Sequence, residues 1–425
     1  MLLAHKIELM PNNKQATYFE MAAGVARFAY NWALEEWNRQ YEAHKQDTSL
    51  PKPDEGALRK LLNKIKKEQF SWMYKVTKYA SQMAIIHLGD AFENYFELVK
   101  NIKLGIVKLP KKIKPRKDGK PYGYPRFKKK GEDDKFTIGN DQFEIDGSRI
   151  RIPKLGWVRM RETLRFTGKL MSATISKRGG KWFVSICVEG EHKPRRPAEN
   201  QGVVGADFGL NADVTLSTGE VIKGPKPHKA LLACVRRLSQ SLSRKQRVTV
   251  EVKQADGTTK KVKRDSKNRA KAKLELAKLH KRIADIRNDF IHKTTTELTR
   301  RFHTIGIEDL NVSGMMKNHH LARSIADVSF FEIRRQLEYK AAMRGGQIVV
   351  ADQWFPSSKQ CSACGYKMAE MPLKVRHWKC PCCGAEHDRD VNAAINLKNM
   401  AVSSTVTVCG EVSSGLGSAE RCSPS

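Results

Sequence analysis

Four cysteines have the spacing of ligands for a structural zinc ion. Cys361 and Cys364 form one Cys-x-x-Cys pair, Cys380 and Cys383 form a second, and a glycine follows each pair. The 15 residues between Cys364 and Cys380 fall within the spacing of four-thiolate zinc ribbons. Cys382 is surplus, because the register of the first pair favours Cys380 and Cys383 as ligands. Four protein ligands leave no open position on zinc, so the sequence predicts a structural zinc; the alternative is reduced cysteines without metal.

Three acidic residues stand at the ends of elements that the sequence predicts to be buried or capped. Asp207 ends the apolar strand VVGAD, Glu308 follows the apolar run TIGI, and Asp390 lies in the first turn of a predicted helix. Asp388 is expected to cap that helix. Because residues two apart on a helix face different ways, we expect only one of this pair, Asp390, to join the other two acids.

If the three carboxylates converge, they form a site for hard divalent cations. Mg²⁺ prefers carboxylate oxygens and retained waters. Two such ions about 3.5–4 Å apart can activate a water and stabilise the leaving oxygen of a phosphodiester. Taken singly, each acid is more often a surface charge or a helix cap, and spacing alone does not establish that the three meet.

The charge of the chain points to nucleic acid. Its 425 residues include 78 Lys and Arg against 45 Asp and Glu, for a formal net charge of +33. A net charge of about 2–8 is enough to keep a small domain soluble, so this excess favours a polyanionic partner. Nucleic acid is the first candidate, and an acidic membrane surface is a distant second. The hydrophobic fraction of 40% excludes global disorder, and the length suggests about three domains.

The same sequence argues against secretion and membrane insertion. The amino terminus MLLAHKIELMP lacks a signal-peptide core, and no run approaches the ~18 apolar residues that span a bilayer. Five of the nine cysteines crowd between residues 361 and 383. This distribution favours a reducing cytosol and a metal site over a disulfide framework.

Two segments hold most of the positive charge. Residues 103–130 contain twelve Lys or Arg and the single acid Asp118, and their prolines and glycines predict an extended arm. Tyr122, Tyr124 and Phe127 are interleaved with these cations and could stack on bases, although a solvated linker is the alternative. Residues 223–300 contain 23 Lys or Arg against seven acids and form a second candidate surface for phosphates.

Periodicity predicts helices first and short strands next. Residues 14–100 are expected to be helical around the loop TSLPKPDEG, and residues 135–190 to form short strands that include a hairpin at Arg178-Gly-Gly. Such strands suggest a small antiparallel barrel or sandwich. The expected helical core positions are Phe19, Ala22, Ala23, Ala26, Tyr30 and Ala33, followed by Ala80, Met83, Ile86, Leu88, Phe92 and Phe96.

The second half of the chain begins with strands at residues 202–220. An inserted hairpin is predicted at residues 248–264 and a long basic helix at 266–302. One buried face is expected on that helix, formed by Leu274, Leu279, Ile283, Ile286, Phe290 and Leu298. The Ser- and Gly-rich segment beyond residue 401 is expected to be disordered.

These residues together resemble the TnpB (OrfB) proteins, compact relatives of type V CRISPR effectors that insertion sequences encode. The resemblance covers nearly the whole chain, and its motifs are jointly very specific. They are Asp207-Phe-Gly-Leu, Ile307-Glu-Asp-Leu-Asn-Val followed by Gly314-Met315, Ser357-Ser-Lys-x-Cys-x-x-Cys-Gly and Asp388-Arg-Asp-x-Asn-Ala-Ala. The family's opening helix is matched at Pro11, Gln15, Arg27, Tyr30 and Asn31, and its basic arm by YPRFKKK.

The resemblance implies a multidomain α+β fold. It places a helical recognition lobe over residues 14–102 and a small β-barrel wedge domain over 1–13 and 103–200. An RNase H-like RuvC nuclease domain is expected over 201–354 and 388–400, interrupted by a zinc ribbon over 355–387. Residues 401–425 are expected to be a disordered tail.

The resemblance also implies residue roles. The RuvC acids map onto Asp207, Glu308 and Asp390, which would hold Mg²⁺, with two ions expected. Zinc would be held by Cys361, Cys364, Cys380 and Cys383. Nucleic-acid contacts are expected from the opening helix, from a segment near the adjacent motif and from the basic arm: Arg27, Asn31, Lys78, Tyr79, Gln82, Arg126, Lys128 and Lys129. Lys78 and Tyr79 could equally be ordinary helix-surface residues.

The implied function is that of an RNA-guided DNA endonuclease. It would bind a guide RNA from the transposon end and cleave double-stranded DNA beside a short transposon-adjacent motif, in one RuvC site. The basic segments would hold the RNA by its backbone and shape, while base pairing reads sequence. We expect a monomeric ribonucleoprotein in the prokaryotic cytosol, associated with the nucleoid and without a membrane partner.

Two other functions remain open. A nuclease-silent RNA-guided DNA-binding regulator would be favoured if one of the acids were replaced. An accessory transposition protein is the second alternative, although no Tyr nucleophile beside paired metal-binding histidines is evident. The insertion at 248–264 departs from the simplest family pattern.

Overall fold

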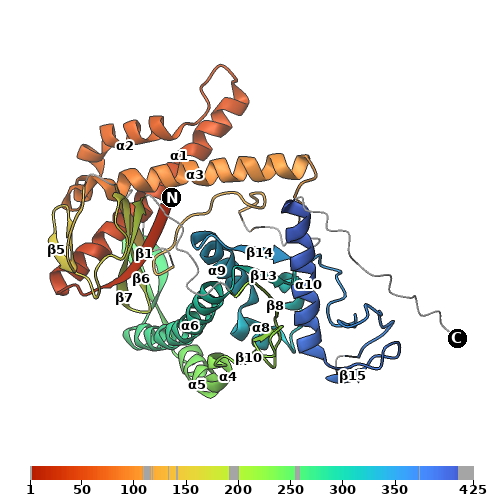
Figure 1. Cartoon of the computed structure of the whole chain (residues 1–425). Helices are drawn as coiled ribbons and strands as arrows, with labels where there is room; N and C mark the ends of the chain where they lie inside the picture. Colours follow the sequence, from red (N-terminus) through yellow and green to blue (C-terminus); the bar gives the residue numbers. More distant parts are fainter. Residues whose placement is uncertain are drawn as a thin grey trace. The chain divides into compact units, whose positions relative to one another are not determined.

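The chain folds as two compact units, Met1–Glu191 and His192–Ser425 (Figure 1). The computed structural model describes residues 2–107, 109, 116, 118–132, 134–139, 142–190, 201–253, 259–372 and 374–409. Each unit contains both helices and β-sheet, so the predicted multidomain α+β class is confirmed. Within the described residues, no helix has the length and apolar character that crossing a membrane requires.

Three long helices dominate the first unit: α1 (Asn13–Gln46), α2 (Glu55–Gln69) and α3 (Lys78–Lys103), with a short 3-10 helix, η1 (Ser71–Lys75), before α3. Asn12 and Gln15 begin α1 with a reciprocal pair of side-chain hydrogen bonds to each other's backbone N–H. The predicted core positions of α1 are all buried, as Phe19, Ala22, Ala23, Ala26, Tyr30 and Ala33.

The buried face of α3 differs from the prediction toward the end of the helix. Trp37 of α1 stacks on Phe92 with ring centroids 4.1 Å apart, and Phe92 is buried as expected. Phe96 is 52% exposed, because it lies one turn beyond that contact at the outer end of the aromatic cluster. Met83 and Ile86 are half-buried, and the inward positions beside them are Ala80, Ala84, Ile85 and Leu88.

The strands of the first unit form two antiparallel sheets. The larger has the order β1-β7-β6-β2, with bounds Leu2–Leu9, Lys181–Glu189, Lys169–Arg178 and Lys135–Gly139. The smaller has the order β3-β4-β5, with bounds Glu144–Asp146, Arg149–Ile152 and Gly156–Arg159. The predicted hairpin is present between β6 and β7, where Gly179 and Gly180 both have positive φ, at 58° and 81°.

Helices and strands of this unit share one hydrophobic core. Phe19 of α1 contacts Trp182 of β7 with ring centroids 5.2 Å apart, and both side chains are buried. The closure of the strands into a barrel and the boundary between a recognition lobe and a wedge domain stay predictions.

The second unit is built on a mixed five-stranded sheet of order β10-β9-β8-β13-β14. The bounds of these strands are Val221–Ile222, Val214–Leu216, Val203–Asp207, Thr304–Ile307 and Gln347–Val350. Strand β9 is antiparallel to both of its neighbours, β10 and β8, whereas β8, β13 and β14 run parallel to one another.

Helices cover both faces of this sheet, since side chains alternate along each strand. One face packs on α6 (Lys267–Arg301) and α9 (Phe330–Met343) through an apolar cluster that includes Val204, Ala206, Ile305, Ile307, Ile291, Leu298, Ile333 and Leu337. The opposite face presents Gly205 and Gly306 to α10 (Arg389–Cys409), which runs across the strands (Figure 1).

The remaining elements of the second unit surround this core. Short helices are α4 (Pro227–Ala230), α5 (Leu232–Ser243), α7 (Val312–Met315) and α8 (Ala322–Val328). The predicted insertion is a hairpin of β11 (Arg247–Lys253) and β12 (Thr259–Asp265). A second hairpin, β15 (His377–Lys379) with β16 (Glu386–Asp388), belongs to the cysteine-rich segment.

Two expectations for the second unit need correction. The first half of α6 is not buried: Leu274 is 39% exposed, and the fully buried positions begin at Ile283. Helix α10 does not end at residue 400 but continues to Cys409, so the predicted tail is helical over 401–409. The reason is packing, because Ala401 is completely buried beside Gly306. Residues 410–425 lie outside the described residues.

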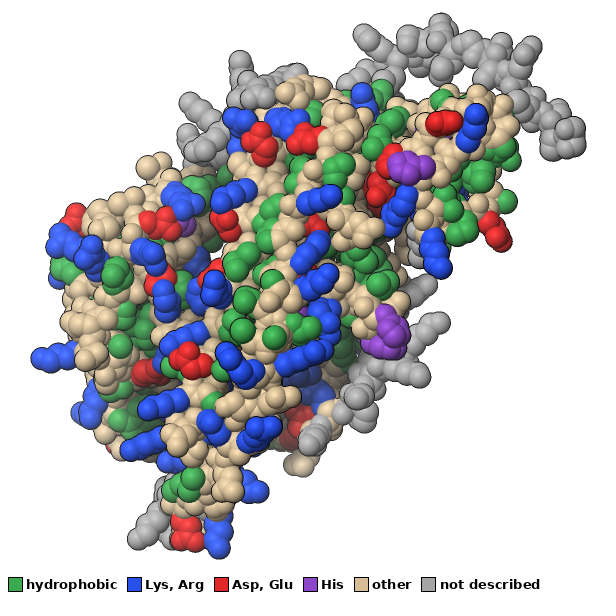
Figure 2. Space-filling model, turned by 90° about the horizontal axis from the view of Figure 1, so that it is seen from below, with side chains coloured by type: hydrophobic (Ala, Val, Ile, Leu, Met, Phe, Trp, Pro, Cys, Tyr) green, Lys and Arg blue, Asp and Glu red, His purple; other side chains and the backbone are tan. Residues whose placement is uncertain are grey.

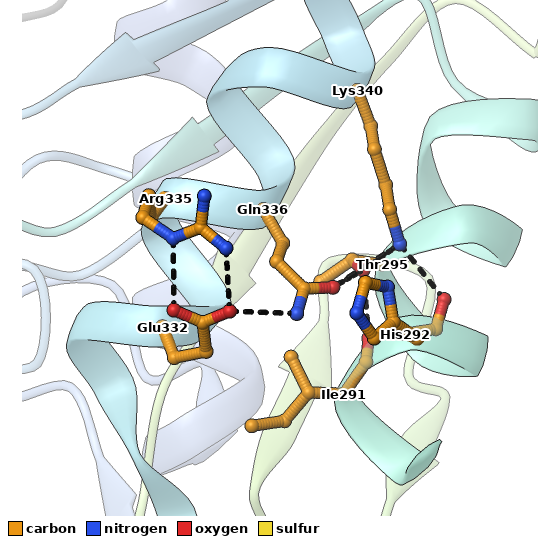
Figure 3. Close-up of polar contacts among 7 residues, drawn as sticks. All are labelled: Ile291, His292, Thr295, Glu332, Arg335, Gln336 and Lys340. Carbon is orange, nitrogen blue, oxygen red and sulfur yellow. Dashed lines mark hydrogen bonds and ion pairs between the residues drawn. The ribbon is translucent and has the colours of Figure 1, made fainter. Parts of the chain in front are cut away.

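A buried polar network joins α9 to α6 (Figure 3). The Lys340 ammonium group donates to the hydroxyls of Thr295 and Thr296 at 2.7 and 2.9 Å and to the His292 carbonyl at 2.9 Å. Gln336 is completely buried, accepts from Lys340 at 3.2 Å and donates to Glu332 at 2.9 Å. Within the described residues, the hydrogen-bond partners of the Lys340 ammonium are uncharged oxygens, and burial lowers the pKa of Lys340 to about 8.

This network predicts a specific pH dependence of stability. Between about pH 8 and the ordinary lysine value of 10.5, the unfolded chain binds a proton at Lys340 that the folded chain releases, so the folded state gains stability as pH rises. We expect the melting temperature of the wild type, measured relative to that of Lys340→Met, to be about 2–4 °C higher at pH 10 than at pH 8. This difference corresponds to ~1 kcal/mol of unfolding free energy once solvent screening is taken into account. Calorimetry across this pH range tests it. Lys271→Met, an exposed lysine on α6, is the control, and parallel curves for wild type and Lys340→Met would contradict the assignment.

Candidate metal centres

The three predicted acids lie at one edge of the second unit's sheet. Asp207 is the last residue of β8, and Glu308 directly follows β13. These parallel strands pair Ala206 with Ile307. Each acid is the next residue after this pair, so the two acids are neighbours at the carboxyl ends of adjacent strands. Asp390 is the second residue of α10, the helix that lies on these strands.

The charges of the other two acids act on Asp207. Burial raises the pKa of Asp207 well above its usual value, and the negative charges of Glu308 and Asp390 raise it further. Burial also raises the pKa of Glu308, against a hydrogen bond from Ser357 that lowers it. Like charges that destabilise one another in a buried place are relieved by a bound cation. The chemistry of the donor set, carboxylate oxygens alone, fits a hard divalent ion.

Two arginines stand beside this acidic cluster. Arg376 Nη1 lies 3.2 Å from an oxygen of Asp390, and the charges of Arg376 and Arg389 both lower the pKa of Asp207. Asp388 accepts hydrogen bonds from the backbone N–H groups of Asp390 and Val391 at 3.0 and 2.9 Å. Asp388 is therefore the cap of α10, as predicted.

Two glycines allow α10 to lie directly on the sheet. Gly205 of β8 and Gly306 of β13 are paired in register. A Cβ atom on Gly205 would lie 1.8 Å from the carbonyl oxygen of Ala394, and one on Gly306 would lie 2.4 Å from that of Leu397. The backbone of α10 thus occupies the space of two missing side chains, which fixes the height of Asp390 above the two acid-bearing strands.

The four predicted cysteines come together in a separate cluster. The sulfur atoms of Cys361, Cys364, Cys380 and Cys383 all lie within 4.8 Å of one another. Among the described residues, no other set of three or more metal-ligating side chains is so closely gathered. The fifth cysteine, Cys382, is outside this set, and which cysteines bind a metal stays a prediction. Four thiols at this spacing could bind zinc.

The two Cys-x-x-Cys turns have the same backbone design. The N–H of Cys361 donates to the carbonyl of Tyr366 at 2.8 Å, and the N–H of Cys380 donates to that of Ala385 at 2.8 Å. Gly365 and Gly384 follow the second cysteine of each turn with φ of 79° and 70°. This backbone conformation favours glycine, which explains the glycine after each pair.

Sequence reasoning missed several polar residues around the acids. Ser357 donates a hydrogen bond to Glu308, and Arg376 contacts Asp390. The side-chain amides of Asn392 and Asn396 on α10 both donate to the carbonyl of Gln360, the residue before Cys361. Two asparagines four apart, Asn392 and Asn396, flanked by Ala, Ile and Leu, were the available signal. Nothing local in the sequence indicates the contacts of Ser357 or Arg376.

Several residues expected to contact nucleic acid have partners within the first unit. Arg27 forms an ion pair with Asp134 at 2.8 Å. The amide of Asn31 donates to the Lys128 carbonyl at 3.0 Å and accepts from the Lys128 N–H at 2.7 Å. The Lys128 ammonium lies 3.7 Å from the centroid of the Tyr30 ring. These contacts fasten the described end of the basic arm to α1.

The rest of the arm is divided between anchors and exposed groups. Tyr124, expected to stack on bases, instead packs against Phe92 and donates a hydrogen bond to Asn38 at 2.5 Å. Tyr122 and Phe127 are about half exposed, and Arg126 and Lys129 are exposed. Residues 108, 110–115 and 117 of the predicted arm lie outside the described residues. Lys and Arg side chains clearly outnumber acids on the face of the molecule in Figure 2.

The start of α3 borders a cavity of the first unit. The cavity has a volume of about 380 Å³, and its lining includes Lys78, Tyr79, Tyr74 and Lys154. Tyr79 is mostly buried, Lys78 is exposed with its ammonium 5.2 Å from the Tyr79 ring centroid, and Gln82 is half-buried one turn further along. Lys78 and Tyr79 are therefore grouped at one concave surface.

Three family models match successive parts of the chain. They are described as a helix-turn-helix domain over residues 1–46, a probable transposase over 185–319 and a Cas12f1-like TNB domain over 330–397. In this chain residues 2–46 form strand β1 and the single helix α1. The TNB match contains all four clustered cysteines.

Whole-length relatives were also found. A protein of Streptomyces pristinaespiralis named "Putative RNA-guided DNA endonuclease" is 35% identical over 96% of this chain and 91% of its own length. InsQ of Escherichia coli K12, with the same designation, is 31% identical over 97% of this chain and 94% of its own. A cryo-EM structure of a Cas12f1-sgRNA-target DNA complex has a similar fold, with a TM-score of 0.50 at 17% identity over 91% of this chain and 83% of that one.

The glycine contacts under α10 generate a prediction about stability. In Gly205→Ala the new methyl group meets backbone atoms of Ala394 and Lys398, so α10 must shift. We expect the free energy of unfolding to fall by about 1–3 kcal/mol. Each kcal/mol lost should lower the melting temperature by roughly 2–4 °C. Gly24→Ala in α1 is the matched control, because its nearest neighbour is the end of the Arg27 side chain at 3.9 Å. Equal melting of the two variants by calorimetry would show that α10 does not lie this close.

Proposed function

Because this chain belongs to the TnpB family of RNA-guided DNA endonucleases of insertion sequences, we propose that it cleaves double-stranded DNA by metal-dependent hydrolysis at Asp207, Glu308 and Asp390. The observation that carries the proposal is geometric: Asp207 and Glu308 stand at the carboxyl ends of the paired strands β8 and β13, and Asp390 lies in the first turn of α10, which packs on them. We propose that the mixed sheet, with α10 on one face, is the RNase H-like RuvC core that the family resemblance implies. We infer that cleavage takes place beside a transposon-adjacent motif.

The acids would hold Mg²⁺, and two ions are expected. When bound, the metal makes a coordinated water more acidic and stabilises charge on the phosphodiester oxygens. Asp207 and Glu308 present their carboxylates from two rigid strands, and Asp390 presents its own from the first turn of α10. Arg376, which contacts Asp390, would compensate for part of the negative charge of the acids and of the incoming phosphate.

The cysteine cluster would hold a structural zinc ion. Four thiolates complete a tetrahedral shell, so the zinc has no position for water or substrate. Its contribution is to fold the segment that carries β15 and β16, which is too short to bury a core of its own. Soft sulfur ligands here and hard oxygen ligands at the acids separate the two metals by chemistry.

The basic surfaces would bind a guide RNA and the RNA–DNA heteroduplex. Exposed Arg126 and Lys129 are proposed to contact phosphates, since nothing in the described structure ties them to a carboxylate. Arg27 and Asn31 have partners in the chain, and we propose that they position the arm so that Lys128 and its neighbours face the RNA. The cavity beside Lys78, Tyr79 and Gln82 is the proposed site near the adjacent motif.

The functional particle is proposed to be one protein chain with one guide RNA, working on DNA in the prokaryotic cytosol. The nuclease-silent regulator is disfavoured because all three acids are present in the sequence.

The acids give the first test of this function. We expect Asp207→Asn, Glu308→Gln and Asp390→Asn each to slow plasmid cleavage by the purified ribonucleoprotein by at least about a hundredfold, because each removes a charged metal ligand. Guided DNA binding should persist. Asp388→Asn is the matched control, since asparagine caps a helix as well as aspartate does. Unchanged cleavage by Asp207→Asn, or none by wild type with RNA and Mg²⁺, would contradict the proposal.

The cysteines give a second test. We expect metal analysis to find one zinc ion per chain in the wild type, and loss of that ion in Cys361→Ser and Cys383→Ser. Cys382→Ser should keep it, because that sulfur lies outside the cluster. The zinc-free variants should melt at lower temperature, as metal binding and local folding are coupled. A full zinc complement in Cys361→Ser, or its loss in Cys382→Ser, would refute the assignment.

A further inference from the structure

A short segment connects the cysteine cluster to the nuclease acids. Residues 357–362 run from the loop after β14 into the first Cys-x-x-Cys turn. At one end the Ser357 hydroxyl donates a hydrogen bond to Oε1 of Glu308. At the other end lies Cys361, a member of the cluster. Six consecutive residues thus touch both metal centres.

This segment is clamped to α10 by two buried amides. Asn396 donates to the carbonyls of Ser357 and Gln360 at 2.8 and 2.7 Å. Asn392 donates to the same Gln360 carbonyl at 2.7 Å and accepts from the Ser362 N–H at 2.9 Å. Both asparagines are almost completely buried: Asn392 is 1% exposed and Asn396 is 4% exposed. Buried amides need their hydrogen-bond partners, so these contacts strongly fix the segment on the helix.

The position of Ser357 suits the orientation of a neighbouring carboxylate. Its side chain is buried at 3% exposure, and its own carbonyl is held by Asn396. A hydroxyl that donates to one carboxylate oxygen restricts the rotation of the acid and leaves the second oxygen for a cation.

We propose that residues 357–362 are a strut through which the cysteine cluster and α10 hold Glu308 in its metal-binding orientation, with Ser357 as a positioning residue. The inference rests on the proposed role of Glu308. It adds that the structural metal and the catalytic metal are coupled, because Cys361 lies between the two clamped residues Gln360 and Ser362. Loosening the strut should disturb Glu308 without reducing the affinity for guide RNA or target.

The first experiment compares Ser357→Ala with Ser357→Thr in the assembled ribonucleoprotein. Removing a group that orients a metal ligand typically weakens metal affinity or activity by about 10–100-fold. We therefore expect Ser357→Ala to need roughly tenfold or more Mg²⁺ for half-maximal cleavage, with guided DNA binding, zinc content and melting temperature unchanged. Ser357→Thr keeps the hydroxyl and should restore most of the wild-type Mg²⁺ requirement.

The second experiment tests the hydrogen bonds between α10 and residues 357–362 by amide exchange and zinc release, without a cleavage assay. In Asn392→Ala the Ser362 N–H loses its acceptor, so its amide exchange should accelerate and zinc should pass to a chelator several times faster than in wild type. Asn399→Ala, an exposed asparagine on the same helix, is the control and should match wild type in both. If Ser357→Ala is poorly folded, Asn392→Ala and Ser357→Thr still decide the question.

The outcomes separate this inference from the function on which it rests. If Glu308→Gln cleaves normally, the proposed nuclease site is wrong. If Glu308→Gln is inactive but Ser357→Ala has the wild-type Mg²⁺ requirement, the positioning role of Ser357 is wrong and the nuclease site stands. Wild-type zinc release and amide exchange in Asn392→Ala would overturn the coupling between the two centres.

Discussion

The close approach of α10 to strands β8 and β13 is the constraint on which the second unit depends. It exists because Gly205 and Gly306, paired in register, have no side chains where the helix backbone passes. Any larger residue would lift the helix and carry Asp390 away from Asp207 and Glu308. The same close approach brings the side-chain amides of Asn392 and Asn396 within hydrogen-bond distance of the Gln360 carbonyl. The absence of two Cβ atoms thus determines where α10 places its residues at both candidate metal centres.

Charge is arranged in opposite ways at the surface and in the site. The chain has a net charge of +33, and exposed cations such as Arg126 and Lys129 are accessible to water and to anions. At the candidate site, burial is the largest cause of the raised pKa of Asp207, and the negative charges of Glu308 and Asp390 add to it. Such a site binds a cation in proportion to the repulsion that the cation relieves. The two signs of charge are thus placed separately, as the proposed nucleic-acid surface and the proposed divalent-metal site require.

How much of this could be predicted from the sequence depends on how local each signal is. The cysteine cluster and the Asp388 cap rest on neighbours within a few residues or on a fixed spacing, and both were predicted correctly. The burial of Phe96 and Leu274 was predicted wrongly, because periodicity shows which face is apolar but not how far along a helix its partner extends. The partners of Arg27 and Asn31 lie 107 and 97 positions away, and no local pattern indicates them. The contact of Ser357 with Glu308, 49 positions apart, was missed for the same reason.

The place of the cysteine cluster in the chain has a physical consequence for the nuclease site. The segment between β14 and α10 joins two elements that border the acids, so a loose loop there would let α10 and Glu308 move independently. A four-thiolate metal site stabilises its own turns without a hydrophobic core, so a short segment can become rigid. The buried amides of Asn392 and Asn396 then transfer that rigidity to Ser357 and, through its hydroxyl, to Glu308. A metal with no open coordination position can therefore affect catalysis only mechanically, by restricting where a carboxylate of the other site can point.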